Sequence, residues 1–291
     1  MPGEGRGLSS RQTQYVVRDR RLGNLATPIN VQKLQRALHA KAKAEAGYRF
    51  YALYDKIHRD DILTHAYAQC CSNKGAPGVD GQEFADVEAY GVQRWLGELA
   101  LALRQETYRP EPIRRVFIPK VNGKLRPLGI STLKDRVVQM LLKMVLEPIW
   151  ESDFLNCSNG FRPGRRTMDC IALLDSYINE RNKYFWVIEG DIRAAFDSIH
   201  QATLLTLLAE RVADRRLLEL IDGFLKAGMM QGQLFHRTDI GTPQGAICSP
   251  LLSNVYLHQL DLYWWRRYGG LHRKAKERRR QAHQGNCALI R

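Results

Sequence analysis

The sequence contains no apolar stretch long enough to cross a bilayer, and its first residues, MPGEGRGLSS, lack the apolar core of a signal peptide. These absences predict a cytoplasmic protein that does not act at a membrane. Cysteine pairs with zinc-site spacing are also missing. Without a secretory context we expect the cysteines to be reduced and mostly buried; they are Cys70, Cys71, Cys157, Cys170, Cys248 and Cys287. No internal repeat or long linker interrupts the 291 residues, which predicts one large domain or two smaller ones.

Acidic residues are outnumbered, because 30 Asp and Glu stand against 44 Lys and Arg and give a net charge of +14. Such a balance suits a polyanionic partner, and the phosphate backbone of a nucleic acid is the obvious candidate. The basic residues gather around residues 104–136 and again around residues 273–280. For the second cluster a solvated loop is the alternative. Binding to phosphate is expected to weaken as the salt concentration rises.

The start of the chain predicts a basic N-terminal extension over residues 1–60. Residues 1–28 are polar, basic and contain glycine, which predicts a mobile arm. From residue 31 to residue 54 the apolar spacing suits an amphipathic helix with a basic face; the spaced residues are Val31, Leu34, Leu38 and Ala42.

The rest of the chain predicts a mixture of helices and hairpins. Thr132 is a candidate helix cap with Asp135 three positions on, and the apolar positions that follow would face a core as far as Pro148. Further helices are expected from Thr167, over 204–209, over 217–225 and after Ser249-Pro250, and hairpins over 114–130, with an Asn122-Gly123 turn, and over 229–237. Helices packed on one side of a small antiparallel sheet would make an α+β fold.

The stretch YFWVIEGDIRAAFDSI, residues 184–199, places an acid directly after an apolar run. Val187 and Ile188 are typical of a buried strand, and Gly190 ends that run just before Asp191. A carboxylate at a strand end can bind a hard cation such as Mg²⁺ together with substrate phosphates. Asp191 is therefore a candidate metal ligand and Asp197 a second one. The alternative is a strand followed by a turn with solvated acids.

A second informative segment, TPQGAICSPLLSN, covers residues 242–254. Its Pro-Gln-Gly tripeptide predicts a turn, and Ser249-Pro250 is a good start for a helix. Together the two segments resemble motifs A and B of reverse transcriptases. They are most similar to those of the group II intron-encoded reverse transcriptase and maturase family.

Upstream segments extend the resemblance to roughly residues 61–291. APGVDG at 76–81 looks like the early glycine and proline turn of the family, and NGFRPGR at 159–165 looks like a later block of it. The hairpin over 114–130 looks like the fingers hairpin above the incoming nucleotide. The resemblance implies a right-hand polymerase with fingers over 61–182 and an incomplete palm over 183–291. It implies that the N-terminal extension grips intron RNA, with a plain packing helix as the alternative.

By the same resemblance, Asp191 would bind Mg²⁺, with the carbonyl of Ile192 as a further ligand, in an enzyme that copies RNA into DNA. Such an enzyme takes an RNA template, a DNA primer and deoxynucleoside triphosphates. Phe196 would be the steric gate that excludes a ribose 2′-hydroxyl. A core phenylalanine is the alternative for this residue.

The resemblance also assigns residues that contact the nucleotide and the RNA. Lys120 and Arg126 would hold the triphosphate, because a point charge and a planar fork both suit phosphate; a surface strand pair is the alternative. Gln244 would line the nucleotide pocket beside the sugar. The arginines expected to contact RNA or template are Arg114, Arg115, Arg162 and Arg165, and Arg162 has support of the fingers fold as its alternative.

The sequence lacks the Tyr-x-Asp-Asp turn that provides further metal ligands in this family. Residues 287–291 look like the strand that leads into that turn, and Asp60-Asp61, at a helix start, cannot replace it. We therefore expect an incomplete palm that is inactive alone and that a missing C-terminal segment or a partner chain would complete. Two functions stay open: a polymerase active once completed, and a non-catalytic protein that binds intron RNA and assists splicing. A retron or CRISPR-associated reverse transcriptase is a less expected relative.

Overall fold

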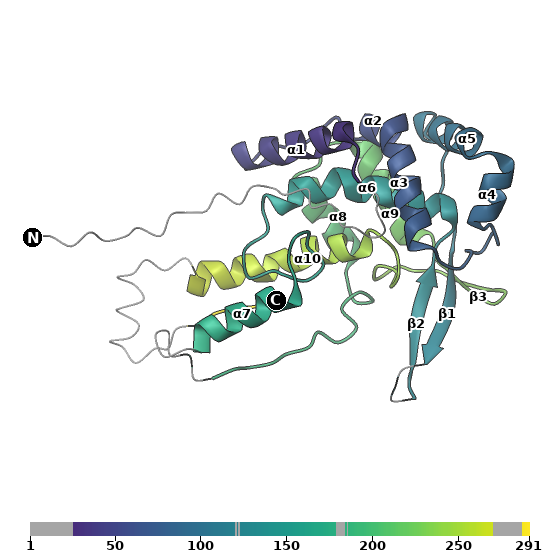
Figure 1. The fold of residues 1–291 in the computed structure, drawn as a ribbon. Coiled ribbons are helices and arrows are strands. Elements are labelled where there is room, and N and C mark those ends of the chain that lie inside the picture. The colour runs from purple at the N-terminus through teal and green to yellow at the C-terminus, as the bar shows by residue number, and fades with distance from the viewer. Residues whose placement is uncertain (1–25, 120, 122, 179–183, 185, 270–286) are drawn as a thin grey trace, which may run out of the picture.

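The structure, a computed structural model, describes residues 26–119, 121, 123–178, 184, 186–269 and 287–291. Figure 1 shows a body of helices from which the hairpin of β1 (Ile113–Pro119) and β2 (Leu125–Ile130) projects, with α7 (Thr167–Ile178) and α10 (Ser249–Trp264) away from the hairpin. Nearly all of the expected mobile arm and the whole basic cluster over 273–280 lie outside the described residues. No helix in the described ranges is both long and apolar enough to cross a membrane.

Helix α6 (Leu133–Glu151) lies at the centre of this body. The hydroxyl of Thr132 accepts a hydrogen bond from the backbone N–H of Asp135 at 3.2 Å, which confirms the predicted cap. Fourteen of the 19 residues of α6 are buried, and the other five are charged residues that keep some contact with solvent. Three helices from the first part of the chain pack against it, namely α1 (Ile29–Ala44), α2 (Tyr54–Ile57) and α3 (Asp60–Asn73).

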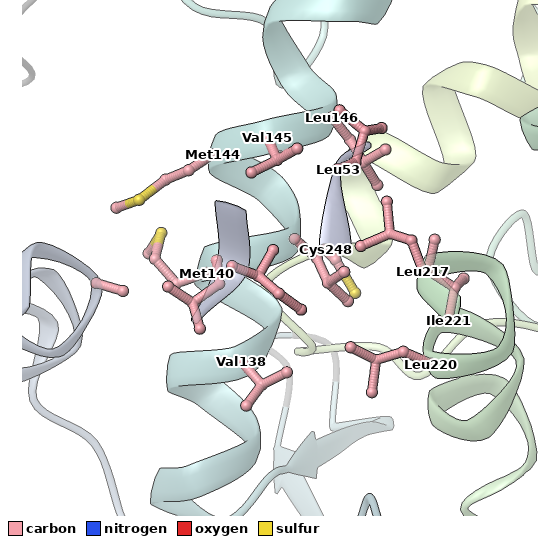
Figure 2. Packing of buried hydrophobic residues seen from close by; sticks show 14 of the residues in the cluster. Leu53, Val138, Met140, Met144, Val145, Leu146, Leu217, Leu220, Ile221 and Cys248 are labelled. Atoms are coloured by element: carbon pink, nitrogen blue, oxygen red, sulfur yellow. The ribbon is translucent and has the colours of Figure 1, made fainter. Parts of the chain in front are cut away.

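The remaining helices pack on one another and on α3 and α10. α4 (Phe84–Tyr90) packs on α5 (Val92–Arg104), and α8 (Gln201–Ala209) packs on α9 (Arg215–Lys226), while the π-helical turn η1 (Trp265–Gly269) follows α10. Figure 2 shows a buried cluster in which Val138 and Leu146 of α6 meet Leu217 and Leu220 of α9. Cys248, just before α10, lies between the two groups. The helices predicted over 204–209 and 217–225 are therefore confirmed and face this core.

Helix α6 does not end at Pro148, as expected from the sequence, but continues to Glu151. Proline has no backbone N–H, so the carbonyl of Met144, four residues earlier, loses its partner within the helix. The side chain of Gln35 in α1 donates to that carbonyl instead, at 3.3 Å. His39, one turn further along α1, bonds through Nδ1 to the carbonyl of Pro148 at 3.0 Å. The neighbouring helix thus replaces the hydrogen bond that proline removes.

The helix predicted over residues 31–54 is shorter than expected. α1 ends at Ala44, and Phe50 instead forms an isolated parallel bridge with Val212. Arg211 is buried beside that bridge and donates hydrogen bonds to carbonyls at the end of α1. Those carbonyls have no partner within the helix, so the guanidinium satisfies them. The N-terminal extension is consequently fastened to the segment between α8 and α9.

One four-stranded sheet, in the order β2-β1-β3-β4, carries the fingers hairpin. Both predicted hairpins are confirmed, because β1 pairs antiparallel with β2, and β3 (Met229–Gln231) pairs antiparallel with β4 (Leu234–His236). β3 runs parallel to β1, however, so the sheet is mixed and not antiparallel as expected. A parallel pair needs a long connection, here the chain from α6 to α9, and local sequence patterns do not reveal it.

The strand expected before Asp191 is not present, because residues 186–190 have no regular secondary structure. Trp186 and Ile188 are 91% and 95% exposed, so the apolar run is not buried either. A strand needs a neighbour to satisfy its backbone hydrogen bonds. Residues 287–291, also expected to form a strand, are irregular as well. With no paired strand beside it in the described part of the chain, a β-branched and aromatic composition is not sufficient.

All six cysteines are free, as expected. Only Cys70 and Cys248 are buried, and burial raises the pKa of each thiol to about 12. Cys287 is exposed and the other three are half-buried, so the expectation of mostly buried cysteines is wrong. The buried pair behaves as apolar core residues, as the position of Cys248 in Figure 2 illustrates.

Asp135 is the buried carboxylate that joins α6 to the base of β1. Its Oδ1 accepts a hydrogen bond from the hydroxyl of Tyr108, and its Oδ2 accepts one from the backbone N–H of Glu111 at 3.2 Å. Burial raises the pKa of Asp135 from 3.8 to about 6, against the opposing effect of these hydrogen bonds. The contribution of this group to stability is therefore fully present below about pH 4 and is lost as the pH rises through about 6.

We predict that Asp135→Asn removes this part of the pH dependence. A shift of about two pKa units corresponds to about 3 kcal/mol, and the neutral amide still offers Tyr108 an oxygen acceptor. In urea unfolding, the free energy of unfolding of the variant relative to that of the wild type should increase by up to that amount as the pH rises from 4 to 7. Parallel pH profiles for the two proteins would contradict the role given to Asp135.

Candidate functional site

The loop over residues 241–245 docks onto the fingers hairpin. Gly129 of β2 donates its backbone N–H to the carbonyl of Gln244 at 2.7 Å. Gly245 has a φ of +105°, and a Cβ at this position would lie 2.4 Å from the carbonyl oxygen of Gly129. Glycine is required there both for the backbone conformation and for the close approach to β2.

The same loop also binds the segment that follows Asp191. The backbone N–H of Thr242 donates to the carbonyl of Phe196 at 2.8 Å. The side chain of Gln244 donates through Nε2 to Oδ2 of Asp197 at 3.3 Å. Two segments that the sequence singled out separately, 184–199 and 242–254, therefore meet each other and the hairpin at one place.

Helix α6 supports this loop from behind. Gln139, buried in α6, accepts a hydrogen bond through Oε1 from the backbone N–H of Ile247 at 2.8 Å, and its Nε2 donates to the hydroxyl of Ser131 at 3.3 Å. The hydroxyl of Ser249, at the start of α10, donates to the carbonyl of Pro243 at 2.9 Å. The loop is thus fixed by the core and not only by its own turn.

A cavity of about 330 Å³ opens where loop, hairpin and segment meet. Its lining includes Arg115 of β1, Asp197, Thr242 and Gln244 together with apolar residues of β1, β2 and β3. Two buried polar atoms here, Oγ1 of Thr242 and Nε of Arg115, have no hydrogen-bond partner among the described residues. The cavity thus offers the carboxylate of Asp197, the guanidinium of Arg115, the amide of Gln244 and the hydroxyl of Thr242. Such a set of groups can bind a polar ligand such as a nucleotide.

The structure brings together only some of the predicted site residues. Gln244 and Arg115 line the cavity, and Phe196 reaches the loop through its backbone carbonyl. Arg114, the next residue along β1, is half-buried and does not line the cavity, although its Nε is likewise buried without a partner in the described ranges. Arg126 is exposed on β2, opposite Ile118 of β1.

Asp191 is not among the residues that line this cavity. It is exposed, as is Ile192, in the irregular segment after residue 190. Within the described ranges, no group of three or more His, Cys, Asp or Glu side chains is placed to hold a metal ion. Both candidate ligands present oxygen, which suits a hard cation. Lys120 lies outside the described residues.

Arg162 has a structural position and not an exposed one. It is 4% exposed, and its Nε and Nη2 donate to the carboxylate of Glu151 at 3.1 and 2.9 Å. Its Nη1 donates to the carbonyls of Leu155 and Ser158. Every nitrogen of the guanidinium is therefore hydrogen-bonded to protein, and the side chain is buried, so its place is in the fold and not on an exposed surface. Arg165 is half-buried and bonds to nearby asparagines.

A buried polar network around Arg291 was not predicted. Its guanidinium donates to both carboxylate oxygens of Asp261 in α10, at 2.8 and 2.5 Å, and to Oδ1 of Asn254 at 2.8 Å. A further bond, at 2.8 Å, reaches the hydroxyl of Ser158. Asp261 and Asn254 stand seven residues apart, which places them on one face of a helix. That spacing of polar residues within an apolar helix is the signal that sequence inspection missed.

Comparisons with known proteins show which family the sequence resembles. Residues 118–272 match the family described as reverse transcriptase (RNA-dependent DNA polymerase). Protein YkfC of Escherichia coli (strain K12) is 40% identical over 246 residues, which cover 82% of this chain and 63% of YkfC. Group II intron-encoded protein LtrA of Lactococcus lactis subsp. cremoris is 39% identical over 215 residues, which cover 74% of this chain and 35% of LtrA. A chain of a partial Cas6-RT-Cas1–Cas2 complex has a TM-score of 0.49 at 25% identity, covering 72% of this chain and 34% of that one.

The chain therefore belongs to the reverse transcriptase family, as the match over residues 118–272 shows. Its relatives support membership of the group II intron reverse transcriptase and maturase family within it, which confirms the resemblance found in the sequence. The chain spans 63% of the length of YkfC and 35% of that of LtrA.

We predict that Gly245→Ala separates the loop from β2 and lowers the free energy of unfolding by about 2–4 kcal/mol, from a backbone clash added to conformational strain. Gly81→Ala is the matched control, because Gly81 has a φ of +70° but open space around its Cβ position. It should lose only the strain contribution of about 1 kcal/mol. Equal losses in urea unfolding would show that the close approach of loop and hairpin does not contribute.

Proposed function

We propose that this chain provides the fingers and part of the palm of an RNA-directed DNA polymerase of a group II intron. The observation that carries the proposal is the loop over 241–245, which fastens the hairpin and the segment after Asp191 around one polar cavity. A polymerase needs such an arrangement, because nucleotide, template and metal ligands come from separate parts of the chain. In this proposal residues 61–182 form the fingers, residues 183–291 the palm and residues 1–60 an extension that contacts intron RNA.

Asp191 and the carbonyl of Ile192 are the proposed ligands for Mg²⁺. The ion would neutralise negative charge that develops on phosphate during nucleotide transfer. The exposure of Asp191 is compatible with this role, since the carboxylate is open to a ligand. One carboxylate is a weak site for a pair of ions, so a second acidic turn of the Tyr-x-Asp-Asp type, from a further segment or a partner chain, belongs to the proposal.

The nucleotide would lie between the hairpin and the loop. Arg126, exposed on β2, and Lys120 are proposed to bind the triphosphate of a deoxynucleotide, and Gln244 to contact its sugar. Phe196 is proposed to exclude a 2′-hydroxyl; its half-buried ring, rather than a fully buried one, favours this role over that of a core residue. Arg114, Arg115 and Arg165 are proposed contacts for RNA or template, whereas the buried Arg162 is proposed to support the fold only.

We predict that the chain binds structured RNA with strongly salt-dependent affinity. With six or more phosphates neutralised, the affinity should fall by about a thousandfold or more between about 50 and 200 mM salt. Arg115→Gln, at a proposed RNA contact, should reduce the slope of log affinity against log salt by about one, and Arg215→Gln, on the exposed face of α9, should leave it unchanged. An affinity insensitive to salt in an anisotropy titration would contradict phosphate binding as the source of affinity.

A second prediction is that the 291-residue chain alone does not extend a DNA primer on an RNA template. Loss of one preorganised electrostatic element commonly lowers the rate by about 10²-fold or more, and here a whole ligand turn is missing from the sequence. The same chain joined to a family segment that carries Tyr-x-Asp-Asp and a thumb should be active with Mg²⁺ and deoxynucleotides.

Asp191→Ala is the control in both forms of the protein and should abolish any activity. Activity of the short chain that disappears with Asp191→Ala would show that the site is complete without a second acidic turn. Inactivity of the extended chain, with RNA binding retained, would instead favour the alternative of a non-catalytic protein that binds intron RNA and assists splicing.

A further inference from the structure

Phe161 combines two features that are each unfavourable for a large apolar residue, an exposed side chain and a left-handed backbone. Its side chain is 66% exposed, and its backbone has a φ of +58°. A left-handed backbone is unusual for a bulky residue without a short polar side chain. Strain of this kind persists only where the neighbouring structure imposes it, and it is concentrated at functional positions.

The residues on both sides of Phe161 are held in place. The carbonyl of Gly160 accepts a hydrogen bond from Nδ2 of Asn254 in α10 at 2.8 Å. Asn159 donates its backbone N–H to the carbonyl of Arg291 at 2.6 Å. Arg162 is anchored to Glu151, as described above. The loop backbone is therefore held on both sides of Phe161, whose side chain is exposed.

The ring of Phe161 contacts the segment that carries Phe196. It meets the ring of Phe196 edge to face, with the ring centroids 6.4 Å apart and an interplanar angle of 73°. Arg166 in the same loop and Arg193 in the Phe196 segment are both exposed. Exposed aromatic and cationic side chains on the same two segments are the combination that binds single-stranded nucleic acid, because bases stack on the ring and phosphates meet the charges.

We propose that Phe161 is a stacking platform for an unpaired base of single-stranded RNA, with Phe196 orienting the platform from one side. This inference rests on the RNA binding proposed above. A single-stranded RNA is favoured over a protein segment as the occupant because of the exposed arginines on the same two segments, Arg166 and Arg193, and the net charge of +14. In this proposal the left-handed backbone holds a large apolar ring in solvent, where a base can stack on it.

The test uses the full chain and Phe161→Gly, in which glycine accepts the backbone conformation while the ring is removed. The probes are a labelled 12-nucleotide single-stranded RNA that carries 2-aminopurine and a duplex of the same length. Phe161→Gly should weaken binding of the single strand by about 5- to 100-fold, the range for one base stacked on an aromatic side chain. Binding of the duplex and the urea midpoint should not fall. Phe161→Tyr, which keeps a ring, should bind within about twofold of the wild type and keep the quenching of 2-aminopurine that stacking causes.

Tyr263→Ala is the matched control, because Tyr263, near the end of α10, is a comparably exposed aromatic residue, 59% exposed, and is not among the proposed RNA contacts. It should bind the single strand as the wild type does. Wild-type affinity of Phe161→Gly for the single strand, or an equal loss for single strand and duplex, would overturn the stacking role. A wild-type chain that binds neither RNA would overturn the proposed function itself, so the two failures are distinguishable.

Discussion

The burial of most of α6 is the constraint on which the rest of the structure depends. A helix with so wide a buried surface must be covered from several directions, and no single neighbouring element can do so. The chain meets this requirement with helices from its beginning, packed on one side, and with α9 and the start of α10 on the other. Elements far apart in sequence are thereby assembled around one axis.

The same helix also positions the candidate site, through polar side chains distributed along its length. Asp135, in its first turn, holds the residues that lead into β1. Gln139, one turn later, holds the loop after Pro243. Glu151, at the far end, holds Arg162 and with it the loop that carries Phe161. The relative placement of hairpin, loop and aromatic platform is therefore set by distances along a single rigid element.

Local signals made much of this fold predictable. Thr132 as a cap, Ser249-Pro250 as a helix start and the hairpin over 114–130 each depend on neighbouring residues only, and each is confirmed. The errors have a common cause in long-range partners. The run over 186–190 has strand composition but lacks a paired neighbour in the described ranges, and the parallel pairing of β1 with β3 joins residues more than 100 positions apart.

In the candidate site, too, local features were predictable from the sequence and long-range contacts were not. The loop over 241–245 and the Phe196 segment were predictable as parts of a site because their residue types and order are distinctive. Their mutual hydrogen bonds were not, and neither was the burial of Arg162, since an arginine in a polar loop has the same appearance in sequence whether it faces RNA or a glutamate of the core. Phe161 escaped notice because its unusual feature is a backbone angle, which composition does not encode.

Pro148 restricts which residues can stand at position 35 of α1. Gln35 and His39, one turn apart in α1, bond to the carbonyls of Met144 and Pro148, one turn apart in α6, so the two helices are locked in a single axial register. If another residue replaced the proline, its N–H would donate to the carbonyl of Met144. The buried amide of Gln35 would then lose its hydrogen-bond acceptor. Positions 35 and 148 are therefore expected to change together during evolution, as a pair separated by more than a hundred residues in sequence but by one hydrogen bond in space.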